Sequence, residues 1–405
     1  MIVIGGGLGG LVTAALAAKR GPVTLFERSR TLGGRFRNIS HEGYQLTTGA
    51  LHMIPHGSRG PLARLLAEAG APCTIVDSYP WATFERDGIQ ERFSSIRSSL
   101  PFMRKAAAAR LLFEMRHLSG PDCSTHELFE RRFDLPLAHD LVRCFLGWSL
   151  SCTPDELPAR DFYAIVKNVF AYGGSGIPLG GCGAVVDALK GALSQNGVSV
   201  RHRAVRSIIV EDGQVAGVED EDGLVYEDRV VVSDIGPKGT LGLLANDAVE
   251  TAYRKSVQAI PESGGIKITL GTSSSLIPHS GILFPLGAER VEGLNQVTNA
   301  DPSLAPEGRH MVMSHQTLRG KNIHKETAKG LADLEELLGN RDYEVLATQA
   351  YFGKNPVNRA SQGNDVLKCP VGGLFLVGDG AKGRGGIEVE GIALGIMAQR
   401  HALAI

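Results

Sequence analysis

The pattern of hydrophobic and polar positions is most regular at the N-terminus. A short apolar run at 2–4 leads into a cluster of glycines, and small residues at 11–18 follow with helical spacing. A second apolar run at 23–26 ends at Glu27. This order predicts a strand, a tight turn, a helix and a second strand that ends in an acidic residue. The residues of the predicted turn are Gly5, Gly7, Leu8, Gly9 and Gly10.

This unit predicts a dinucleotide site. Glycines permit the tight turn and let the backbone approach a pyrophosphate, and the following helix presents free N–H groups and the positive end of its dipole. Glu27 lies twenty residues after Gly7, where a carboxylate can accept hydrogen bonds from ribose hydroxyls. The same carboxylate would repel a 2′-phosphate, which argues against NADP. The alternative, an ordinary glycine-rich turn, gives Glu27 no role.

A second glycine pair follows the acidic residue closely. The segment 28–35 reads Arg-Ser-Arg-Thr-Leu-Gly-Gly-Arg, and it resembles an extension in the flavoprotein superfamily of amine oxidases, protoporphyrinogen oxidase and phytoene desaturases. The resemblance implies a loop that packs over the pyrophosphate of FAD and leads to the flavin. The stretch 49–53 resembles the family's segment beside the isoalloxazine ring. The FAD contacts implied here are Arg28, Gly33, Gly34, Arg35, Gly49, Ala50 and Leu51.

The C-terminus resembles the closing motif of the same family. An apolar strand at 374–377 runs into Gly-Asp-Gly, and a helix from about 387 reaches the end of the chain. In the family the aspartate binds the ribityl or pyrophosphate part of FAD, and the helix points its N-terminus at the flavin. A helix dipole stabilises the negative charge of a reduced flavin. A surface turn before an amphipathic helix is the alternative. The implied FAD contacts are Gly378, Asp379, Glu388, Val389 and Gly391.

A third match lies in the middle of the chain. A Pro-x-Gly-Gly turn at 177–183 precedes a predicted helix at 184–193, and this arrangement resembles the phytoene-desaturase-like branch. The resemblance assigns an adenine contact to Val205. No strand is expected before the turn and no acidic residue follows at the right distance, so we predict no separate NAD(P)H site. Further strands are expected at 198–201, 204–210, 215–218 and 229–233.

Length and composition restrict the class of protein. The 405 residues suffice for two domains, and a 43% hydrophobic content supports a packed core. A net charge of −1 gives no indication of nucleic-acid binding. The six cysteines form no Cys-x-x-Cys pair. Cys123-x-x-His126 has the spacing of a metal-binding pair, but the sequence offers no second pair of ligands to complete a site, so no metal is predicted. With no signal peptide or membrane span expected, we predict a cytoplasmic protein with reduced thiols, in possible peripheral contact with the inner membrane face.

The fold class predicted is α/β, with a discontinuous Rossmann-like FAD-binding domain and an inserted α+β substrate domain on a mixed, mostly antiparallel sheet. The first domain comprises 1–70, 175–237 and 365–405, and the second comprises 71–174 and 238–364. The predicted substrate domain has a hairpin at 81–93, helices at 101–118, 125–134, 136–147, 158–171, 240–258 and 325–338, and strands at 264–271, 281–286, 294–299, 309–316 and 343–351.

Two side chains are candidates for catalysis. His52 lies in the flavin-side segment and is expected either to act as an acid/base or hold substrate, or to be a packed or loop-binding histidine. Lys267 alternates with isoleucines, and in amine oxidases a strand lysine holds a water at flavin N5; a solvent-facing lysine is the alternative. Three aromatic residues are predicted to line a lipophilic tunnel or to pack in the core: Tyr163, Phe170 and Tyr172.

The predicted function is non-covalent FAD-dependent hydride transfer to or from carbon–carbon bonds of a lipophilic, isoprenoid or carotenoid-like substrate. No aromatic residue follows Phe375, which lowers the case for an amine oxidase. A flavin amine or protoporphyrinogen oxidase is the alternative enzyme. A non-enzymatic lipid-binding protein like the GDP dissociation inhibitors is a rival, and Asp379 argues against it. The amphipathic helix at 101–118 is either a membrane-surface helix or a core helix. The sequence leaves open the redox direction, the electron donor or acceptor and the oligomeric state.

Overall fold

Five short strands form the parallel sheet that the N-terminal pattern predicts. The first strand lies at its centre, in the order β21-β13-β1-β2-β9, and every neighbouring pair is parallel. The computed structural model describes residues 1–49, 51–86, 88–92, 102–352, 357–358 and 369–405. The five strands are β1 (Ile2–Ile4), β2 (Thr24–Phe26), β9 (Ser199–Arg201), β13 (Val231–Ser233) and β21 (Leu374–Leu376).

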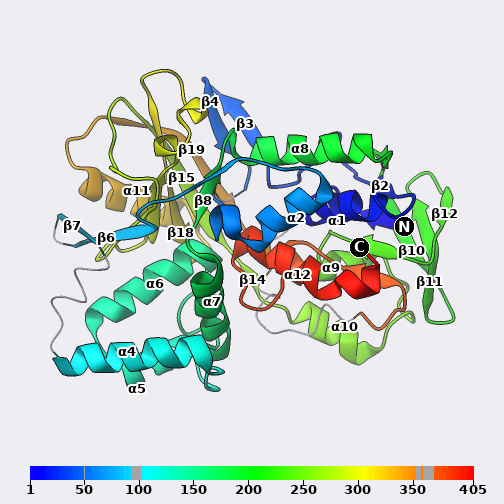
Figure 1. Ribbon diagram of the computed structural model, residues 1–405, viewed down its shortest axis with the longest axis horizontal. Coiled ribbons are helices and arrows are strands. Elements are labelled where there is room, and N and C mark those ends of the chain that lie inside the picture. Colours follow the sequence, from blue (N-terminus) through cyan, green and yellow to red (C-terminus); the bar gives the residue numbers. More distant parts are fainter. Residues whose placement is uncertain (50, 87, 93–101, 353–356, 359–368) are drawn as a thin grey trace.

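The parallel sheet is buried on both faces. Val3 and Val232 point toward a group of helices, whereas Ile2, Ile4 and Val231 point toward a small antiparallel sheet and two short helices. This alternation explains why the strands are apolar throughout. On the first face lie α1 (Leu8–Ala18), α2 (Pro61–Ala69), α8 (Gly181–Gln195) and α12 (Glu388–Leu403); on the second lie β10 (Val205–Glu211), β11 (Gln214–Asp220), β12 (Val225–Glu227), α9 (Pro237–Gly242) and α10 (Thr251–Gln258) (Figure 1).

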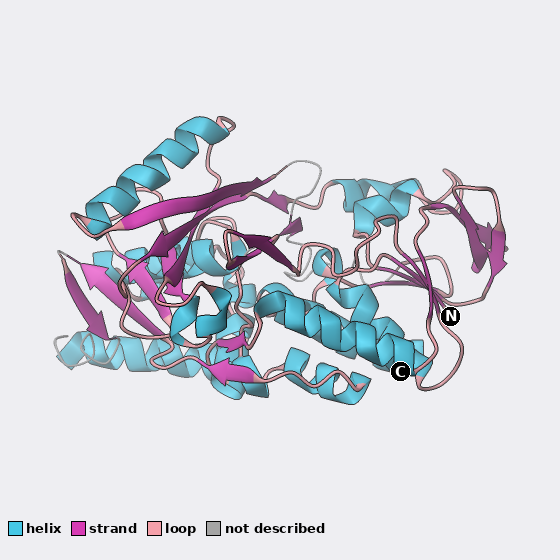
Figure 2. Cartoon of the chain, turned by 90° about the horizontal axis from the view of Figure 1, so that it is seen from above, coloured by secondary structure: helices cyan, strands magenta, loops and turns pink. Residues whose placement is uncertain are grey.

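A larger sheet occupies the other end of the long axis (Figure 2). Its order is β19-β15-β18-β17-β16-β6-β7, and each pair is antiparallel except β16 and β6. The mixed, mostly antiparallel sheet is therefore confirmed. Helix α11 (Ile323–Leu338) packs Leu334 against Ile266 and Ile268 of its face. The strands are β6 (Ala82–Arg86), β7 (Ile89–Arg92), β15 (Gly265–Thr272), β16 (Ile282–Pro285), β17 (Gly293–Gln296), β18 (His310–Thr317) and β19 (Tyr343–Tyr351).

The helices that the structure describes between the strands β7 and β8 form a separate group with its own core. Ser124 and Glu127 make a reciprocal capping box at the start of one helix, which fixes the point where the chain turns into it. Phe129 and Phe162 meet edge to face inside the group. The helices are α4 (Phe102–His117), α5 (Thr125–Arg132), α6 (Pro136–Leu150) and α7 (Ala159–Tyr172).

Some local predictions were wrong. The predicted helix at 240–258 is two helices, since α9 ends at Gly242 and α10 begins only at Thr251. A strand does precede the Pro-x-Gly-Gly turn, but it pairs antiparallel with β5 outside the parallel sheet. The pattern also missed several short elements: β3 (Asn38–His41), β4 (Tyr44–Thr47), β5 (Ile75–Asp77), β8 (Gly176–Pro178), β14 (Glu262–Ser263), β20 (Val357–Asn358) and the 3-10 turns at Gly57–Arg59, Val297–Asn299, Pro302–Leu304 and Asp379–Ala381.

Within the described ranges, no helix combines the length and the apolar character needed to cross a bilayer. The domain boundaries stay a prediction, since the elements above do not test where one unit ends and the next begins.

Candidate functional site

The glycine turn packs too tightly for side chains. A Cβ on Gly10 would overlap the carbonyl oxygen of Gly5, which itself adopts a positive φ of 98°. The third glycine thus lets helix α1 lie close to the end of β1. The N-cap residue of α1, Gly7, makes no side-chain cap hydrogen bond, and of the first-turn N–H groups that of Gly10 donates to the Asp234 carboxylate. This helix end lies near the carboxyl end of the parallel sheet.

The second glycine pair packs on this turn. The Gly33 N–H donates to the Gly6 carbonyl oxygen at 2.7 Å, and a Cβ on Gly34 would lie 3.4 Å from the Gly7 Cα. The extension at 28–35 therefore folds back over the glycine turn, as its resemblance implies. The structure places Arg28 at the exposed rim of this loop.

Glu27 lies beside the turn at the end of β2. Its Oε2 accepts the Gly6 N–H at 2.7 Å, and its Oε1 accepts the Ser29 N–H at 2.8 Å. The spacing seen in the sequence therefore brings the acid and the turn together. A contact with ribose stays a prediction. Val205, the predicted adenine contact, is half-buried at the start of β10 and packs on the second face of the parallel sheet.

An ion-pair cluster joins the N-terminal extension to the C-terminal motif. Arg35 Nη2 lies 2.7 Å from Asp379 Oδ2, and Lys382 Nζ lies 2.7 Å from Asp379 Oδ1. Burial alone would raise the pKa of Asp379, but the charges of Lys382 and Arg35 outweigh it and lower that pKa. The sequence pattern missed Lys382, although its position three residues after the aspartate within a glycine-rich loop was a usable signal.

The N-terminus of α12 lies next to this cluster. No side chain caps it at Ile387, and Glu388 has a positive φ of 44°, a strained conformation for a non-glycine residue. Burial raises the pKa of Glu388, and the nearby Lys382 opposes that shift. A Cβ on Gly391 would lie 2.8 Å from the Lys382 side chain, so the absence of a side chain at Gly391 leaves room for the lysine to reach Asp379.

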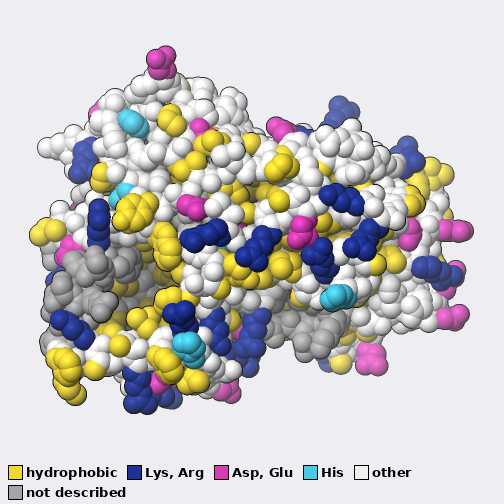
Figure 3. Space-filling view, in the orientation of Figure 1, with side chains coloured by type: hydrophobic (Ala, Val, Ile, Leu, Met, Phe, Trp, Pro, Cys, Tyr) yellow, Lys and Arg dark blue, Asp and Glu magenta, His cyan; other side chains and the backbone are white. Residues whose placement is uncertain are grey.

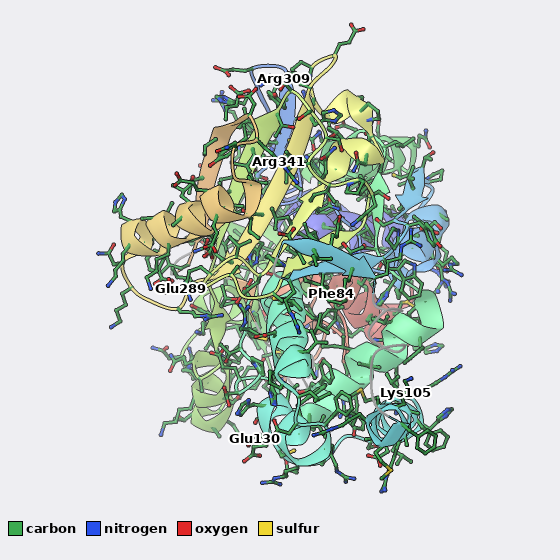
Figure 4. The ribbon with its side chains drawn as sticks, turned by 90° about the vertical axis from the view of Figure 1, so that its left-hand side faces the viewer. Phe84, Lys105, Glu130, Glu289, Arg309 and Arg341 are labelled. Atoms are coloured by element: carbon green, nitrogen blue, oxygen red, sulfur yellow. The ribbon has the colours of Figure 1, made fainter. Side chains whose placement is uncertain are left out.

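A largely apolar cavity of about 540 Å³ opens beside the N-terminus of α12. It lies between the large sheet, the helices α6 and α7, and the segment that follows Gly49. Phe84, labelled in Figure 4 on β6, packs in the cluster that supports Trp148 and Phe284 of its wall. The residues that line it are Phe36, Leu51, Met53, Pro55, His56, Tyr79, Pro80, Trp81, Ala82, Arg92, Phe145, Trp148, Ser149, Val169, Gly173, Gly174, Ser175, Ile282, Phe284, Ile387, Glu388 and Val389.

Lys267 is fully buried on β15, so the alternative of a solvent-facing lysine is wrong. Its Nζ donates to the carbonyl oxygens of Thr47 and Gly49 at 2.8 and 2.7 Å. Burial lowers its pKa to about 7, and Cys182 opposes that shift. The lysine therefore ties the large sheet to the segment that enters the cavity wall. Ala50, between Gly49 and Leu51, lies outside the described residues.

His52 has both ring nitrogens bound to backbone groups. Nδ1 accepts the Cys182 N–H at 3.1 Å, so Nε2 carries the proton and donates to the Gln45 carbonyl oxygen at 2.6 Å. Burial lowers the pKa of His52 to about 4, which keeps the ring neutral. This geometry favours the loop-binding alternative over an acid/base role. Asn38 binds the same Pro-x-Gly-Gly turn at Gly180 and Gly183.

A polar cluster that the sequence did not predict lies beside Lys267 on the large sheet. His315 pairs with Lys267 across the strands, and its Nε2 contacts the hydroxyl of Tyr351. The Ser151 hydroxyl lies 2.8 Å from that of Tyr351, and Ser151 itself has a positive φ of 50°. Trp148 covers His315 edge-on. Because these residues come from β18, β19 and the end of α6, no local pattern identifies them.

The three predicted tunnel aromatics do not line the cavity. Tyr163 is buried among the helices, Phe170 is exposed under the Arg116 guanidinium, and Tyr172 packs against His56. Core packing therefore describes Tyr163, whereas Tyr172 is only partly buried and neither interpretation describes the exposed Phe170. Over the described residues, no group of three or more His, Cys, Asp or Glu side chains is arranged to hold a metal ion.

Comparison with known proteins adds an independent result. The family model of the flavin-containing amine oxidoreductases matches residues 8–391. An uncharacterized protein of Methanocaldococcus jannaschii is 43% identical, over 98% of this chain and 97% of its own. The crystal structure of an oxidoreductase from Methanosarcina mazei is 38% identical and superimposes with a TM-score of 0.93 over 99% of both chains.

Two similar proteins carry names of carotenoid enzymes. The chloroplastic prolycopene isomerase of Daucus carota is 25% identical, over 85% of this chain and 63% of its own length. The phytoene desaturase of Cercospora nicotianae is 30% identical, over 65% of this chain and 49% of its own length. This chain therefore spans about half to two thirds of these two enzymes.

Proposed function

Because the chain belongs to the flavin-containing amine oxidoreductases, with FAD as cofactor, we propose that it transfers hydride to or from carbon–carbon bonds of a lipophilic, isoprenoid or carotenoid-like substrate. One observation carries this proposal. The cavity walls are mostly apolar and aromatic, and the cavity ends at the N-terminus of α12. An elongated hydrocarbon chain fits such a surface, and the names of the carotenoid relatives support the same class.

We assign the cofactor to the place where the glycine turn, the second glycine pair and the C-terminal motif meet. The fit is supported by two helix N-termini whose N-cap residues, Gly7 and Ile387, make no side-chain cap hydrogen bond. Glu27 would bind ribose, and Arg35 with Lys382 would offset the charge of the pyrophosphate. Asp379 would bind the ribityl chain or the pyrophosphate. The other proposed contacts are Gly5, Gly7, Leu8, Gly9, Gly10, Arg28, Gly33, Gly34, Gly49, Ala50, Leu51, Val205, Gly378, Glu388, Val389 and Gly391.

Bound FAD supplies or accepts the hydride. The protein's own residues position the substrate and exclude water. The aromatic walls at Trp148 and Phe284 hold an apolar chain against the segment 387–389. Lys267 fixes the backbone at Thr47 and Gly49, so the cavity wall keeps its shape. With a pKa near 7, Lys267 can also hold or release a proton at Nζ near this wall.

An amine oxidase is the second candidate. The observation that favours it is Lys267, a buried strand lysine of the kind that amine oxidases place near flavin N5. The apolar cavity favours the hydrocarbon substrate over an ammonium group, which needs carboxylate or carbonyl partners. The flavin of this family performs redox chemistry, which argues against a non-enzymatic lipid-binding protein.

We further propose that α4 contacts an anionic membrane surface. Phe102, Met103 and Phe113 are exposed by 81%, 77% and 61%, and the helix carries four cations against one carboxylate. Figure 3 shows apolar and basic side chains side by side at this end of the molecule. The helix packs on α7, whose Val169 lines the cavity. A lipid substrate could then pass from the membrane to the cavity.

The first test uses the purified holoprotein. Its visible spectrum and the mass of the extracted cofactor measure bound FAD, and anaerobic mixing with isoprenoid hydrocarbons, amines or NADPH shows which of them bleaches the flavin. Trp81 and Trp148, the two tryptophans of the chain, both line the cavity, so their fluorescence reports ligand entry. We expect isoprenoids to quench this fluorescence. Bleaching by amines alone would overturn the proposal in favour of the second candidate.

A further inference from the structure

One acidic side chain lies against the glycine turn. Asp234 follows β13, and its backbone N–H donates to the Ile4 carbonyl oxygen at 2.7 Å. A Cβ on Gly7 would lie 2.5 Å from Asp234 Oδ2, and a Cβ on Gly9 would lie 2.7 Å from Oδ1. A Cβ on Gly378 would overlap the same carboxylate. Asp234 is therefore wedged between the glycine turn and the C-terminal motif, where no sequence pattern assigned it a role.

The surroundings of this carboxylate disfavour its charge. Its Oδ2 is buried without a hydrogen-bond partner among the described residues, while the Gly10 N–H in the first turn of α1 donates to the carboxylate. Burial raises the pKa of Asp234 to about 7, against the effect of the Gly10 N–H. Of the charged groups that face it, Asp379 and Glu27 raise this pKa and Arg35 lowers it.

The same helix end is where the pyrophosphate of FAD is proposed to bind. A pyrophosphate carries two negative charges, and a charged carboxylate a few ångströms away would repel it. Two arrangements avoid the repulsion: the carboxyl group becomes neutral, or the side chain turns away. The tight contacts of Asp234 with Gly7, Gly9 and Gly378 leave little room for the second.

We propose that Asp234 takes up a proton from solvent when FAD binds, so that FAD affinity depends on pH through this residue. The inference rests on the proposed placement of the cofactor. Below pH 7 the free protein already holds the proton, and affinity is independent of pH. Above pH 7 each FAD that binds takes up as much as one proton, so affinity falls by up to tenfold per pH unit.

The experiment compares the holoprotein with Asp234→Asn, which keeps the size of the side chain and removes its charge. Ultrafiltration at pH 6, 7, 8 and 9 measures FAD retention, and the fluorescence of released FAD measures the dissociation rate. Calorimetric FAD titration at pH 8 in two buffers of different ionisation enthalpy counts the protons taken up. Glu388→Gln tests a second acid of raised pKa near the same site. Because Glu388 is itself a proposed FAD contact, only the pH slope of this variant is compared with wild type, and not its absolute affinity. Thermal melting checks that each variant is folded.

We expect wild type and Glu388→Gln to lose affinity about tenfold between pH 7.5 and 8.5, and Asp234→Asn to bind FAD equally well across the range. A flat wild-type profile without proton uptake would overturn the inference while leaving the cofactor placement intact. A pH slope that Asp234→Asn retains, or that Glu388→Gln abolishes, would overturn it in favour of another acid. If no variant or wild type binds FAD, the proposed function fails together with the inference.

Discussion

The two sheets of this protein build their parts of the site in different ways. At the parallel sheet the proposed cofactor site is shaped mainly by backbone: a glycine-rich turn, two helix N-termini and the glycines that let segments touch. At the large sheet the important groups are side chains, namely the buried Lys267 and His315 and the partly buried Tyr351. The first region therefore tolerates almost no added atoms at its glycines, whereas the second depends on charge and hydrogen bonding.

The largest effect is expected at the glycine turn, where the backbone of Gly10 packs directly against that of Gly5. Gly10→Val would force a side chain into the carbonyl oxygen of Gly5, so α1 would have to move away from β1. We expect loss of FAD retention and about 3 kcal/mol or more of destabilisation, measured by the flavin spectrum and by urea unfolding. Gly21→Ala is the matched control, because a Cβ there meets nothing within 4 Å. Equal behaviour of the two variants would contradict the close-packed turn.

The next effect tests the ion-pair cluster that links the two ends of the chain. Asp379→Ala leaves the buried Lys382 and the nearby Arg35 without their shared partner. Since an uncompensated buried cation costs about 3 kcal/mol, we expect a lower melting temperature and markedly weaker FAD binding. The double variant Asp379→Ala/Lys382→Met should recover part of the stability. No recovery would mean that the aspartate acts on its own rather than through the lysine.

A smaller effect is expected at the large sheet, where the stability of the fold should depend on pH through Lys267. The folded pKa of Lys267, about 7, lies below the ordinary value of 10.5, so the unfolded chain binds more protons between these values. Stability attributable to this lysine is therefore present above pH 10.5 and is lost as pH falls toward 7, by on the order of 3 kcal/mol. Relative to Lys267→Met, wild type should gain stability from pH 7 to 10 in denaturant titrations.

Lys190 provides the control, because it is an exposed lysine that pairs with Asp187 three residues away on the same helix. Lys190→Met should run parallel to wild type over the same pH range. A Lys267→Met curve parallel to wild type would contradict the depressed pKa and would return Lys267 to a purely structural role.

The comparison also explains what the sequence could predict. The glycine turn, Glu27 and the second glycine pair are local in the chain, and their spacing is a direct consequence of backbone geometry, so the pattern identified them. The positions of Lys267 and Asp234 depend on which strands become neighbours. Both look like ordinary polar residues beside a strand until the sheets assemble. The prediction of a single helix at 240–258 was wrong for a related reason. The helical pattern of the sequence continues across the break between α9 and α10, and packing imposes that break.

The smallest expected effect concerns the outer surface of α4. Phe113→Ser removes a largely exposed ring that packs on His117 of the same helix, so neither FAD content nor melting temperature should change. If the helix lies on a membrane, the loss of one partly inserted ring costs about 1 kcal/mol, or about fivefold in partitioning. Cosedimentation with vesicles of anionic phospholipid measures this, and vesicles of neutral phospholipid are the comparison, since the basic side chains should favour the anionic surface. Equal sedimentation of wild type and variant would mean that α4 is a solvated helix. It would also contradict the proposal that the substrate enters the cavity from a membrane at this helix.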